Sequence, residues 1–313
     1  MKTPTISAVV TTYNAEEYVG QALTAILSQT RPPEEVVVVD DGSTDGTQEE
    51  LARFGADIRV VRQANRGHAS ALNHGFGEAR GDYLAKCDAD DIWEPTKLER
   101  QLQALDDHPE IDIAFGCARY FGQGDGLFAS PPGEGLLDRR DFARRLYRAN
   151  LVCSTSTLIR RRLYQELGPF EELQRVSVED YDYWLRALRA GAVFFYDPSV
   201  LVRCRRHESN VSNNLLSMYW STHLAHVRYA DLVEDSSLAH RAMAYDLLLI
   251  ARQLVEENRP LQARAAFIAS LGYKLNPRGL TWALILSAPE RYRRMLTGGL
   301  TSARRALPRT AIL

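Results

Sequence analysis

The chain has 313 residues, of which 45% are hydrophobic and 25% charged, and its formal net charge at pH 7 is −2. These values are ordinary for a soluble globular protein of about two domains, and the small net charge argues neither for nor against a polyanionic partner. The longest apolar stretch, near residues 280–288, is far shorter than the roughly 20 residues that cross a bilayer, which argues against a membrane-spanning helix.

The first 115 residues alternate between strand-like and helix-like patterns. Short apolar runs alternate with segments whose apolar residues recur at helical spacing, which is typical of βαβ units and a mainly parallel sheet. Asn14 and Glu17 predict an N-cap for the first helix. The predicted strands are residues 6–10, 36–39, 58–62, 83–87 and 111–117, and the predicted helices are residues 15–29, a segment from about 47, residues 68–79 and a segment from about 95.

The rest of the chain changes in character along its length. Residues 121–135 are rich in Gly and Pro and predict an exposed loop. A mixed segment continues to about residue 214, and residues 215–269 are helical in pattern. From residue 272 onward there are eight Lys/Arg and one acid. We therefore expect a first domain at 1–214 and a helical extension with a basic tail at 215–313.

Four widely separated cysteines give an expectation about the compartment. They form no CxxC pair and no Cys/His spacing that suits zinc. The N-terminal apolar run is too short for a signal peptide and leads directly into polar residues. We expect reduced, structural cysteines in a cytoplasmic protein. The cysteines are Cys87, Cys117, Cys153 and Cys204.

Small polar and acidic residues follow three of the predicted strands where these strands end. If the strands are parallel neighbours, the clusters open onto one edge of the sheet, where ligands bind in open α/β sheets. Aspartates gathered there repel one another unless a cation lies among them, and a hard divalent metal holding a phosphorylated ligand meets that need. The pattern predicts a site for a nucleotide diphosphate. The clusters are Thr11-Thr12-Tyr13-Asn14, Asp40-Asp41-Gly42-Ser43 and Asp88-Ala89-Asp90-Asp91.

These clusters, with Asn65-Arg66-Gly67-His68 and Glu179-Asp180, occur in the register of a known family. Residues 7–212 resemble the family 2 glycosyltransferases of the GT-A fold. The resemblance implies a Rossmann-like, mainly parallel central sheet flanked by helices, with a nucleotide-binding half at 1–115 and an acceptor half at 116–214. It also implies an inverting, hexosyltransferase-type enzyme that moves a sugar from a nucleotide-diphosphate sugar to an acceptor hydroxyl. The implied acceptor is a growing lipid-linked glycan for a surface polysaccharide.

Asp88-Ala89-Asp90 resembles the DXD motif of that family. Two carboxylates two residues apart at a strand end can divide their work. We expect Asp88 to hold the ribose or a metal-bound water, and Asp90 to ligate the metal that bridges the phosphates. Mn²⁺ or Mg²⁺ is the expected ion, because both take oxygen ligands, usually one or two carboxylates together with the phosphates. The alternative is an acidic turn that caps a helix at residues 93–105.

A second group of residues resembles the family's nucleotide pocket. Asp41 resembles the aspartate that accepts a hydrogen bond from the base, which favours a UDP- or dTDP-sugar and leaves a GDP-sugar open. Turn formation alone also accounts for an aspartate in this sequence. Thr11, Tyr13 and Asn14 are expected to line the same pocket, with helix capping as the alternative for Asn14. Arg66 resembles a basic residue that reaches the nucleotide, and a solvated arginine is the alternative.

Glu179-Asp180 resembles the family's ED motif, whose aspartate is the catalytic base. The reaction needs one carboxylate to take the proton from the acceptor hydroxyl as its oxygen attacks the anomeric carbon. The alternative is a capping box formed by Ser177 and Asp180 at the start of a helix. In that position we expect the helix N-terminus to lower the pKa of Asp180 and keep it ionised at pH 7.

The last candidates lie at and after residue 150. His207 resembles the C-terminal histidine that serves some GT-A enzymes as a metal ligand, and a histidine without metal is the alternative. Arg205 or Arg206 can help hold the diphosphate, or belong to a basic loop. Residues 150–156 lie on the acceptor side and are candidates for acceptor contacts.

The basic tail and the overall activity each have competing interpretations. The tail suits an interfacial helix on an anionic membrane surface, or a helix that packs with a solvated basic face. Nothing elsewhere in the chain supports nucleic-acid binding. A sugar-phosphate nucleotidyltransferase is the alternative enzyme, but the residues after the first predicted strand are not Gly-rich. A non-catalytic nucleotide-sugar-binding relative is the non-enzyme alternative.

Overall fold

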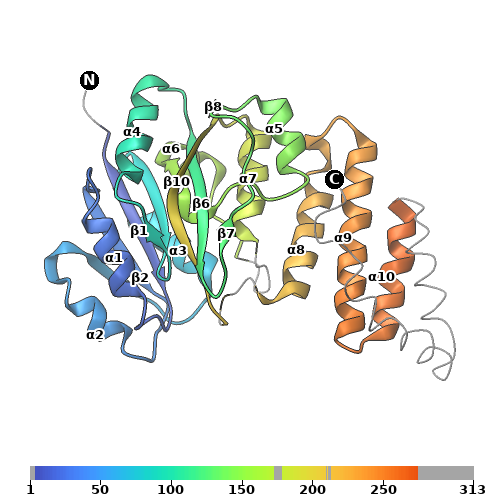
Figure 1. The fold of residues 1–313 in the computed structure, drawn as a ribbon, viewed down its shortest axis with the longest axis horizontal. Coiled ribbons are helices and arrows are strands. Elements are labelled where there is room, and N and C mark those ends of the chain that lie inside the picture. The colour runs from blue at the N-terminus through green and yellow to red at the C-terminus, as the bar shows by residue number, and fades with distance from the viewer. Residues whose placement is uncertain (1–3, 173–177, 209, 211–212, 274–313) are drawn as a thin grey trace. The chain divides into compact units, whose positions relative to one another are not determined.

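A computed structural model describes residues 4–172, 178–208, 210 and 213–273. The chain divides into two compact units, residues 1–213 and residues 214–313. The first unit contains one large sheet with helices against it (Figure 1). The second unit is helical in its described part.

The sheet of the first unit has the strand order β3-β2-β1-β4-β9-β6-β10-β5, with β7 paired to β6 and β8 paired to β10. Pairs β1–β2, β1–β4, β2–β3 and β6–β10 are parallel, whereas β9 is antiparallel to β4 and to β6. The strands are β1 (Ile6–Thr12), β2 (Glu35–Asp40), β3 (Arg59–Arg62), β4 (Tyr83–Asp88), β5 (Ile92–Trp93), β6 (Ile113–Gly122), β7 (Gly126–Leu127), β8 (Gly135–Leu136), β9 (Leu158–Arg160) and β10 (Phe194–Arg206).

Helices cover both faces of the parallel part of the sheet. All residues of β1 are buried, which explains its continuous apolar run rather than an alternating pattern. Val10 of β1 belongs to the same core cluster as Leu23 of α1. Val9 points to the other face, where α3 approaches so closely that a side chain on Gly75 would collide with it. The helices are α1 (Val19–Leu27), α2 (Thr47–Ala52), α3 (His68–Glu78), α4 (Lys97–Asp107), α5 (Arg139–Leu146), α6 (Arg161–Leu167) and α7 (Glu179–Ala190), with short 3-10 turns η1 (Gly55–Asp57) and η2 (Ser154–Ser156).

Two local predictions differ from the structure. The N-cap prediction for Asn14 and Glu17 is wrong, because α1 begins at Val19 and its N-cap residue, Tyr18, makes no side-chain cap bond. Asn14 instead adopts a positive φ of 48°, and its side-chain oxygen accepts a 2.8 Å bond from the Thr44 N–H. The predicted loop at 121–135 is also not wholly irregular. The end of β6 forms a short antiparallel pairing with β7, which turns the chain back on itself.

The described part of the second unit consists of α8 (Leu215–Arg228), the 3-10 turn η4 (Ala230–Leu232), α9 (Ser236–Glu256) and α10 (Pro260–Tyr273), as the helical pattern predicted. Ile250 of α9 and Phe267 of α10 are buried in a shared core. A buried ion pair joins His226 Nδ1 of α8 to Asp246 Oδ2 of α9 at 2.7 Å. The predicted basic tail lies almost entirely outside the described residues. None of the helices described in either unit is long and apolar enough to cross a bilayer.

Candidate active site

The ends of β1, β2 and β4 lie side by side at one edge of the sheet. The backbone N–H of Asp41 donates to the Thr12 carbonyl at 2.9 Å, and that of Ala89 donates to the Thr11 carbonyl at 3.2 Å. Parallel pairing therefore continues past the apolar runs and brings the residues after β2 and β4 to either side of β1. Three segments far apart in the sequence thus deliver polar side chains to one place.

The Asp41 carboxylate is buried and organises the loop between β3 and α3. One oxygen accepts from the Arg66 N–H at 2.9 Å and from Gln63 Nε2 at 2.8 Å, and the other accepts from the Gly67 N–H at 2.8 Å. Gly67 needs its glycine here, because its φ is +91°. An ionised carboxylate has about four acceptor positions, so these three donors leave about one for a ligand.

The other candidates near Asp41 differ in how they face the edge. The Arg66 side chain is 65% exposed and pairs with Glu172 at 3.3 Å, so its backbone rather than its guanidinium lies against Asp41. Tyr13 is 50% exposed. Thr11 Oγ1 lies 3.4 Å from His68 Nδ1 and 3.5 Å from Asp88 Oδ1 at the end of β4, which puts Thr11 on the side of the edge toward β4.

Asp88 and Asp90 turn toward different partners. Asp88 Oδ1 lies 3.2 Å from Lys86 Nζ and 3.5 Å from His68 Nε2. Burial raises the pKa of Asp88, but the positive charges of Lys86 and His68 outweigh it and hold that pKa below its usual value. Asp90 Oδ2 lies 2.9 Å from His207 Nε2 and 3.2 Å from Asn210 Nδ2. The two carboxylates of the motif are therefore in separate environments.

The end of β10 carries His207 to Asp90. The His207 ring stacks on Tyr18, with centroids 5.1 Å apart and an interplanar angle of 23°. Arg205 fixes this end, because its N–H donates to Asp91 Oδ1 at 3.0 Å and its Nε donates to the Asp90 carbonyl at 3.1 Å. The Arg205 guanidinium is therefore hydrogen-bonded to the backbone of Asp90, within the Asp88-Ala89-Asp90 motif.

Asp90 and His207 have the chemistry of a two-residue metal site. A carboxylate oxygen and an imidazole nitrogen 2.9 Å apart, both on half-buried side chains, suit Mn²⁺ and suit Mg²⁺ less well. Within the described ranges, no group of three His, Cys, Asp or Glu side chains is arranged to hold a metal alone. A metal here would complete its coordination with phosphate and water oxygens, as is usual for these ions.

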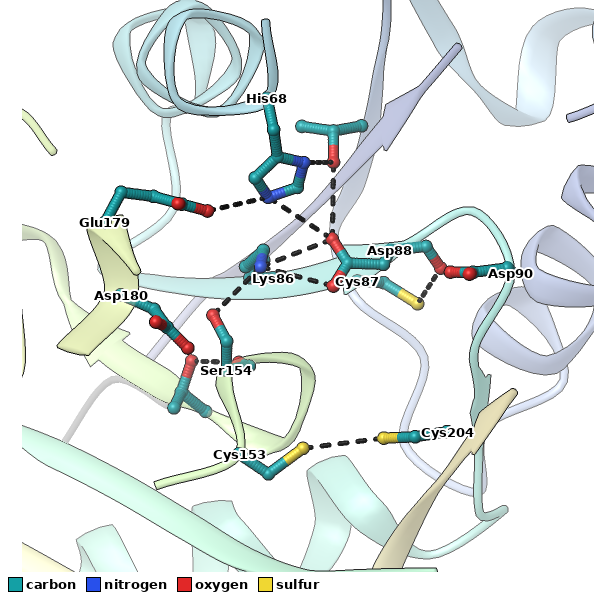
Figure 2. A network of polar contacts seen from close by, with 12 residues as sticks. His68, Lys86, Cys87, Asp88, Asp90, Cys153, Ser154, Glu179, Asp180 and Cys204 are labelled. Carbon is teal, nitrogen blue, oxygen red and sulfur yellow. Dashed lines mark hydrogen bonds and ion pairs between the residues drawn. The ribbon is translucent and has the colours of Figure 1, made fainter. Parts of the chain in front are cut away.

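Glu179 and Asp180 are the first two residues of α7 and lie opposite the Asp88 side of the site (Figure 2). Glu179 Oε1 is 3.6 Å from His68 Nε2, so one imidazole lies between the two acidic motifs. Asp180 Oδ2 is 3.4 Å from Asn150 Nδ2, and Asp180 Oδ1 accepts from the Tyr181 N–H at 2.6 Å.

The expectation that the helix N-terminus lowers the pKa of Asp180 is wrong. Desolvation and the adjacent Glu179 charge raise that pKa to about 7, although Lys86 and the Tyr181 N–H act in the opposite direction. Ser177, the proposed partner in a capping box, lies outside the described residues, and Val178 is the N-cap residue of α7. Asp180 is therefore poised to change protonation near neutral pH.

The sequence did not identify Lys86 and His68 as site residues, and it included Ser154 only as part of the 150–156 segment. Lys86 Nζ lies between Asp88 and Ser154 Oγ, 2.9 Å from the latter (Figure 2). A signal for Lys86 was present, since a lysine two residues before Asp88 in a buried strand lies on the same face as that aspartate. No comparable signal marks Ser154, because η2 approaches β4 only in the folded chain.

A cavity of about 470 Å³ opens beside His207. It is bounded by the end of β6, the turn to β7 and the end of β10, and its walls combine aromatic, amide and charged groups. The residues that line it include Tyr120, Gln123, Asp125, Arg206, His207 and Asn210. Its walls offer several hydrogen-bonding groups to a polar ligand.

Comparisons with known proteins agree with this architecture. A family model described as Glycosyl transferase family 2 matches residues 7–168, which is more than half of the chain. The chain is 27% identical over 250 residues to an uncharacterized glycosyltransferase, RT0329, of Rickettsia typhi, covering 77% of this chain and 78% of that protein. Some relatives are longer: the chain covers 40% of a Rickettsia felis glycosyltransferase to which it is 30% identical, over 74% of its own length.

Solved structures with the same fold include two glycosyltransferases. One is S. aureus TarS 1–349 in complex with UDP-GlcNAc, with a TM-score of 0.69, 18% identity, and coverage of 96% of this chain and 92% of that one. The other is the mannosyltransferase PcManGT of Pyrobaculum calidifontis in complex with GDP-Man and Mn²⁺, with a TM-score of 0.59, 21% identity, and coverage of 97% and 87%. At these identities the likeness shows the fold, and the predicted α/β fold of the GT-A type is confirmed.

Proposed function

The chain belongs to glycosyl transferase family 2 and is a glycosyltransferase, and we propose that it moves a sugar with inversion from a nucleotide-diphosphate sugar to an acceptor hydroxyl. The observation that carries the proposal is the meeting of two acidic motifs across His68. Asp88 Oδ1 and Glu179 Oε1 both face His68 Nε2, at 3.5 Å and 3.6 Å. A donor held along the sheet edge would present its anomeric carbon to the α7 side.

The donor site of this proposal follows the sheet edge from β2 to β4. Asp41, Thr11, Tyr13 and Asn14 lie near the proposed base pocket, and Asp88 lies where a ribose would follow. The complexes of TarS with UDP-GlcNAc and of PcManGT with GDP-Man support a nucleotide-sugar donor as a class. A UDP- or dTDP-sugar is favoured, and a GDP-sugar is the second choice, because an aspartate can accept an N–H from any of these bases.

A metal is part of the proposal, with Asp90 and His207 as its protein ligands. When bound, Mn²⁺ or Mg²⁺ supplies positive charge that stabilises the leaving diphosphate. Asn210 lies 3.2 Å from Asp90 and from His207 Nε2, so its amide helps to orient both ligands. The Mn²⁺ in the PcManGT complex supports this choice of ion.

Asp180 is the proposed catalytic base. It takes the proton from the acceptor hydroxyl as that oxygen forms its bond to the anomeric carbon, and the electron pair of the breaking glycosidic bond leaves with the nucleoside diphosphate. A single displacement of this kind inverts the anomeric centre. A base whose pKa is about 7 suits this task, because general base catalysis is most effective when the pKa lies near the working pH. Glu179 keeps that pKa high and is the second catalytic carboxylate of the proposal.

We assign the acceptor side to residues 150–156 and to the cavity beside His207. Asn150 donates toward Asp180, and the cavity offers aromatic and amide groups of the kind that bind sugar hydroxyls. A lipid-linked glycan of a surface polysaccharide remains the proposed acceptor. The sequence of the basic tail supports a position on the cytoplasmic face of an anionic membrane.

The first test is thermal stabilisation of the protein by UDP, dTDP, GDP, CDP and ADP, each with Mn²⁺ and with EDTA. A ligand at 100 times its dissociation constant stabilises a folded protein by roughly 2.7 kcal/mol. We expect one diphosphate to stabilise the protein more with Mn²⁺ than with EDTA, and the additional stabilisation by Mn²⁺ to be lost in Asp90→Ala. Asp180→Asn serves as the matched control, since it should bind the same diphosphate normally. No response to any nucleotide would contradict the proposed donor site.

A further inference from the structure

Lys86 is a buried cation at the centre of the site. The proposed sugar transfer gives it no role. It is in β4, and 3% of its surface is exposed. Its ammonium group lies 3.2 Å from Asp88 Oδ1 and donates to Ser154 Oγ at 2.9 Å. A buried ammonium group is unfavourable unless charged or polar partners surround it. The groups that Lys86 contacts therefore account for its burial.

The groups around Lys86 belong to the acidic motifs and to the acceptor side. Asp88, Glu179 and Asp180 all raise the pKa of Lys86 above its usual value, although burial by itself would lower it. Lys86 therefore stays charged at any working pH. His68 is the other titratable group in this network, and it faces Asp88 and Glu179 (Figure 2).

Lys86 also connects two parts of the chain that must be aligned for transfer. Ser154 belongs to η2, and Asn150, four residues earlier, donates to Asp180 Oδ2 at 3.4 Å. One ammonium group thus holds the Asp88 carboxylate and the segment that contacts the Asp180 carboxylate.

We propose that Lys86 is a positioning residue, which fixes Asp88 against the 150–156 segment and supplies the positive charge that lets Asp88, Glu179 and Asp180 share one site. The role of Asp180 as the base rests on the proposed function, but the contacts of Lys86 do not. Without this charge, three carboxylates would face one another with only His68 between them, and protonation of Asp180 would become easier.

The test is a direct titration of Asp180 by carbon-13 NMR of aspartate carboxyl groups, with the Asp180 resonance assigned as the one lost in Asp180→Asn. The wild-type protein should titrate at about pH 7. In Lys86→Met the midpoint should rise by about one pH unit or more, since a neighbouring opposite charge shifts a carboxyl pKa by roughly that amount. Ser154→Ala is the control: it removes the hydrogen bond and keeps the charge, so its midpoint should stay near that of the wild type.

A compensating variant separates electrostatics from folding. Lys86→Met combined with Glu179→Gln removes one positive and one negative charge, and its Asp180 midpoint should return toward the wild-type value. An unchanged midpoint in Lys86→Met, or a double variant no different from the single one, would overturn the proposal. If Lys86→Met does not fold, two other variants decide. Lys86→Arg must keep the wild-type midpoint of the Asp180 titration, and the double variant must fold; failure of either would overturn the proposal. Because no nucleotide sugar is used, a shifted midpoint in a protein without transferase activity would contradict the proposed function alone.

Discussion

Replacement of Lys97 by methionine should make the first unit more stable at acidic pH. Lys97 is fully buried at the start of α4. Its ammonium donates to Gln101 Oε1 at 2.9 Å and to the Thr157 carbonyl at 3.4 Å, and it lies 4.1 Å from the centre of the Trp93 ring. Burial lowers the pKa of Lys97 from 10.5 to about 7. The folded protein therefore holds this proton much less tightly than the unfolded chain does.

The size and sign of the effect follow from that shift. At about 1.4 kcal/mol per pKa unit, protonated Lys97 costs the fold roughly 4 to 5 kcal/mol below pH 7. Between about pH 7 and 10.5 the unfolded chain binds more protons than the folded protein, so the cost falls as pH rises, to roughly 2 kcal/mol at pH 9. Methionine removes the cost but also the two hydrogen bonds and the contact with Trp93, together about 2 to 3 kcal/mol. We expect a gain of roughly 2 kcal/mol at pH 6 and almost none at pH 9.

Melting followed by tryptophan fluorescence measures this difference. Replacing Trp220 and Trp282 by phenylalanine leaves Trp93 and Trp184, both buried in the first unit, as the only reporters. In a unit of this size, 2 kcal/mol corresponds to a shift in Tm of roughly 4 to 8 °C. Arg162→Met, at a side chain that is 80% exposed, is the control and should change stability by less than about 0.5 kcal/mol. A Lys97→Met protein that is less stable at pH 6, or equally stabilised at pH 6 and pH 9, would refute this reasoning.

Three further predictions concern catalysis, the metal and the second unit. Because Asp180 must be ionised to accept a proton, kcat/KM should decrease about tenfold for each pH unit below about pH 7. In Asp180→Asn, kcat/KM should be at least about 100-fold lower than in the wild type. Release of nucleoside diphosphate measures both effects. His207→Ala should weaken calorimetric binding of the diphosphate with Mn²⁺ but not the weaker binding in EDTA; equal losses would argue against metal ligation. Asp246→Asn should destabilise the second unit by about 1 to 3 kcal/mol in thermal unfolding, because it removes the charge from the buried acceptor that His226 contacts at 2.7 Å. A change below about 0.5 kcal/mol would mean that this pair contributes little.

The sheet edge could be predicted from the sequence because three neighbouring strands are largely apolar and end in polar residues: β1 at Thr12, β2 at Asp40 and β4 at Asp88. The strand ends themselves lie beyond the apolar runs, since Thr12 and Asp40 are buried parts of their strands. The pKa of Asp180 could not be predicted in the same way. At exposed sites, a helix N-terminus stabilises an ionised carboxylate by up to about 1 kcal/mol. At Asp180, desolvation and the charge of Glu179 raise the pKa more strongly than the helix lowers it. Both effects depend on how α7 packs, which the sequence does not show. The sequence left open whether Arg66 reaches the nucleotide or is solvated; its side chain is 65% exposed, and its backbone N–H donates to Asp41.

The proposed division of work between Asp88 and Asp90 rests on their separate partners. Asp88 is engaged by Lys86 and His68, whose positive charges favour its ionised form and leave little need for a further cation. Asp90 faces the His207 ring and the uncharged Asn210 amide instead. A divalent ion bound at Asp90 would therefore gain more than one bound at Asp88. On this basis Asp88→Asn should weaken diphosphate binding both with Mn²⁺ and in EDTA, whereas Asp90→Asn should weaken only the binding that depends on Mn²⁺. The opposite pattern in calorimetry would assign the metal to Asp88.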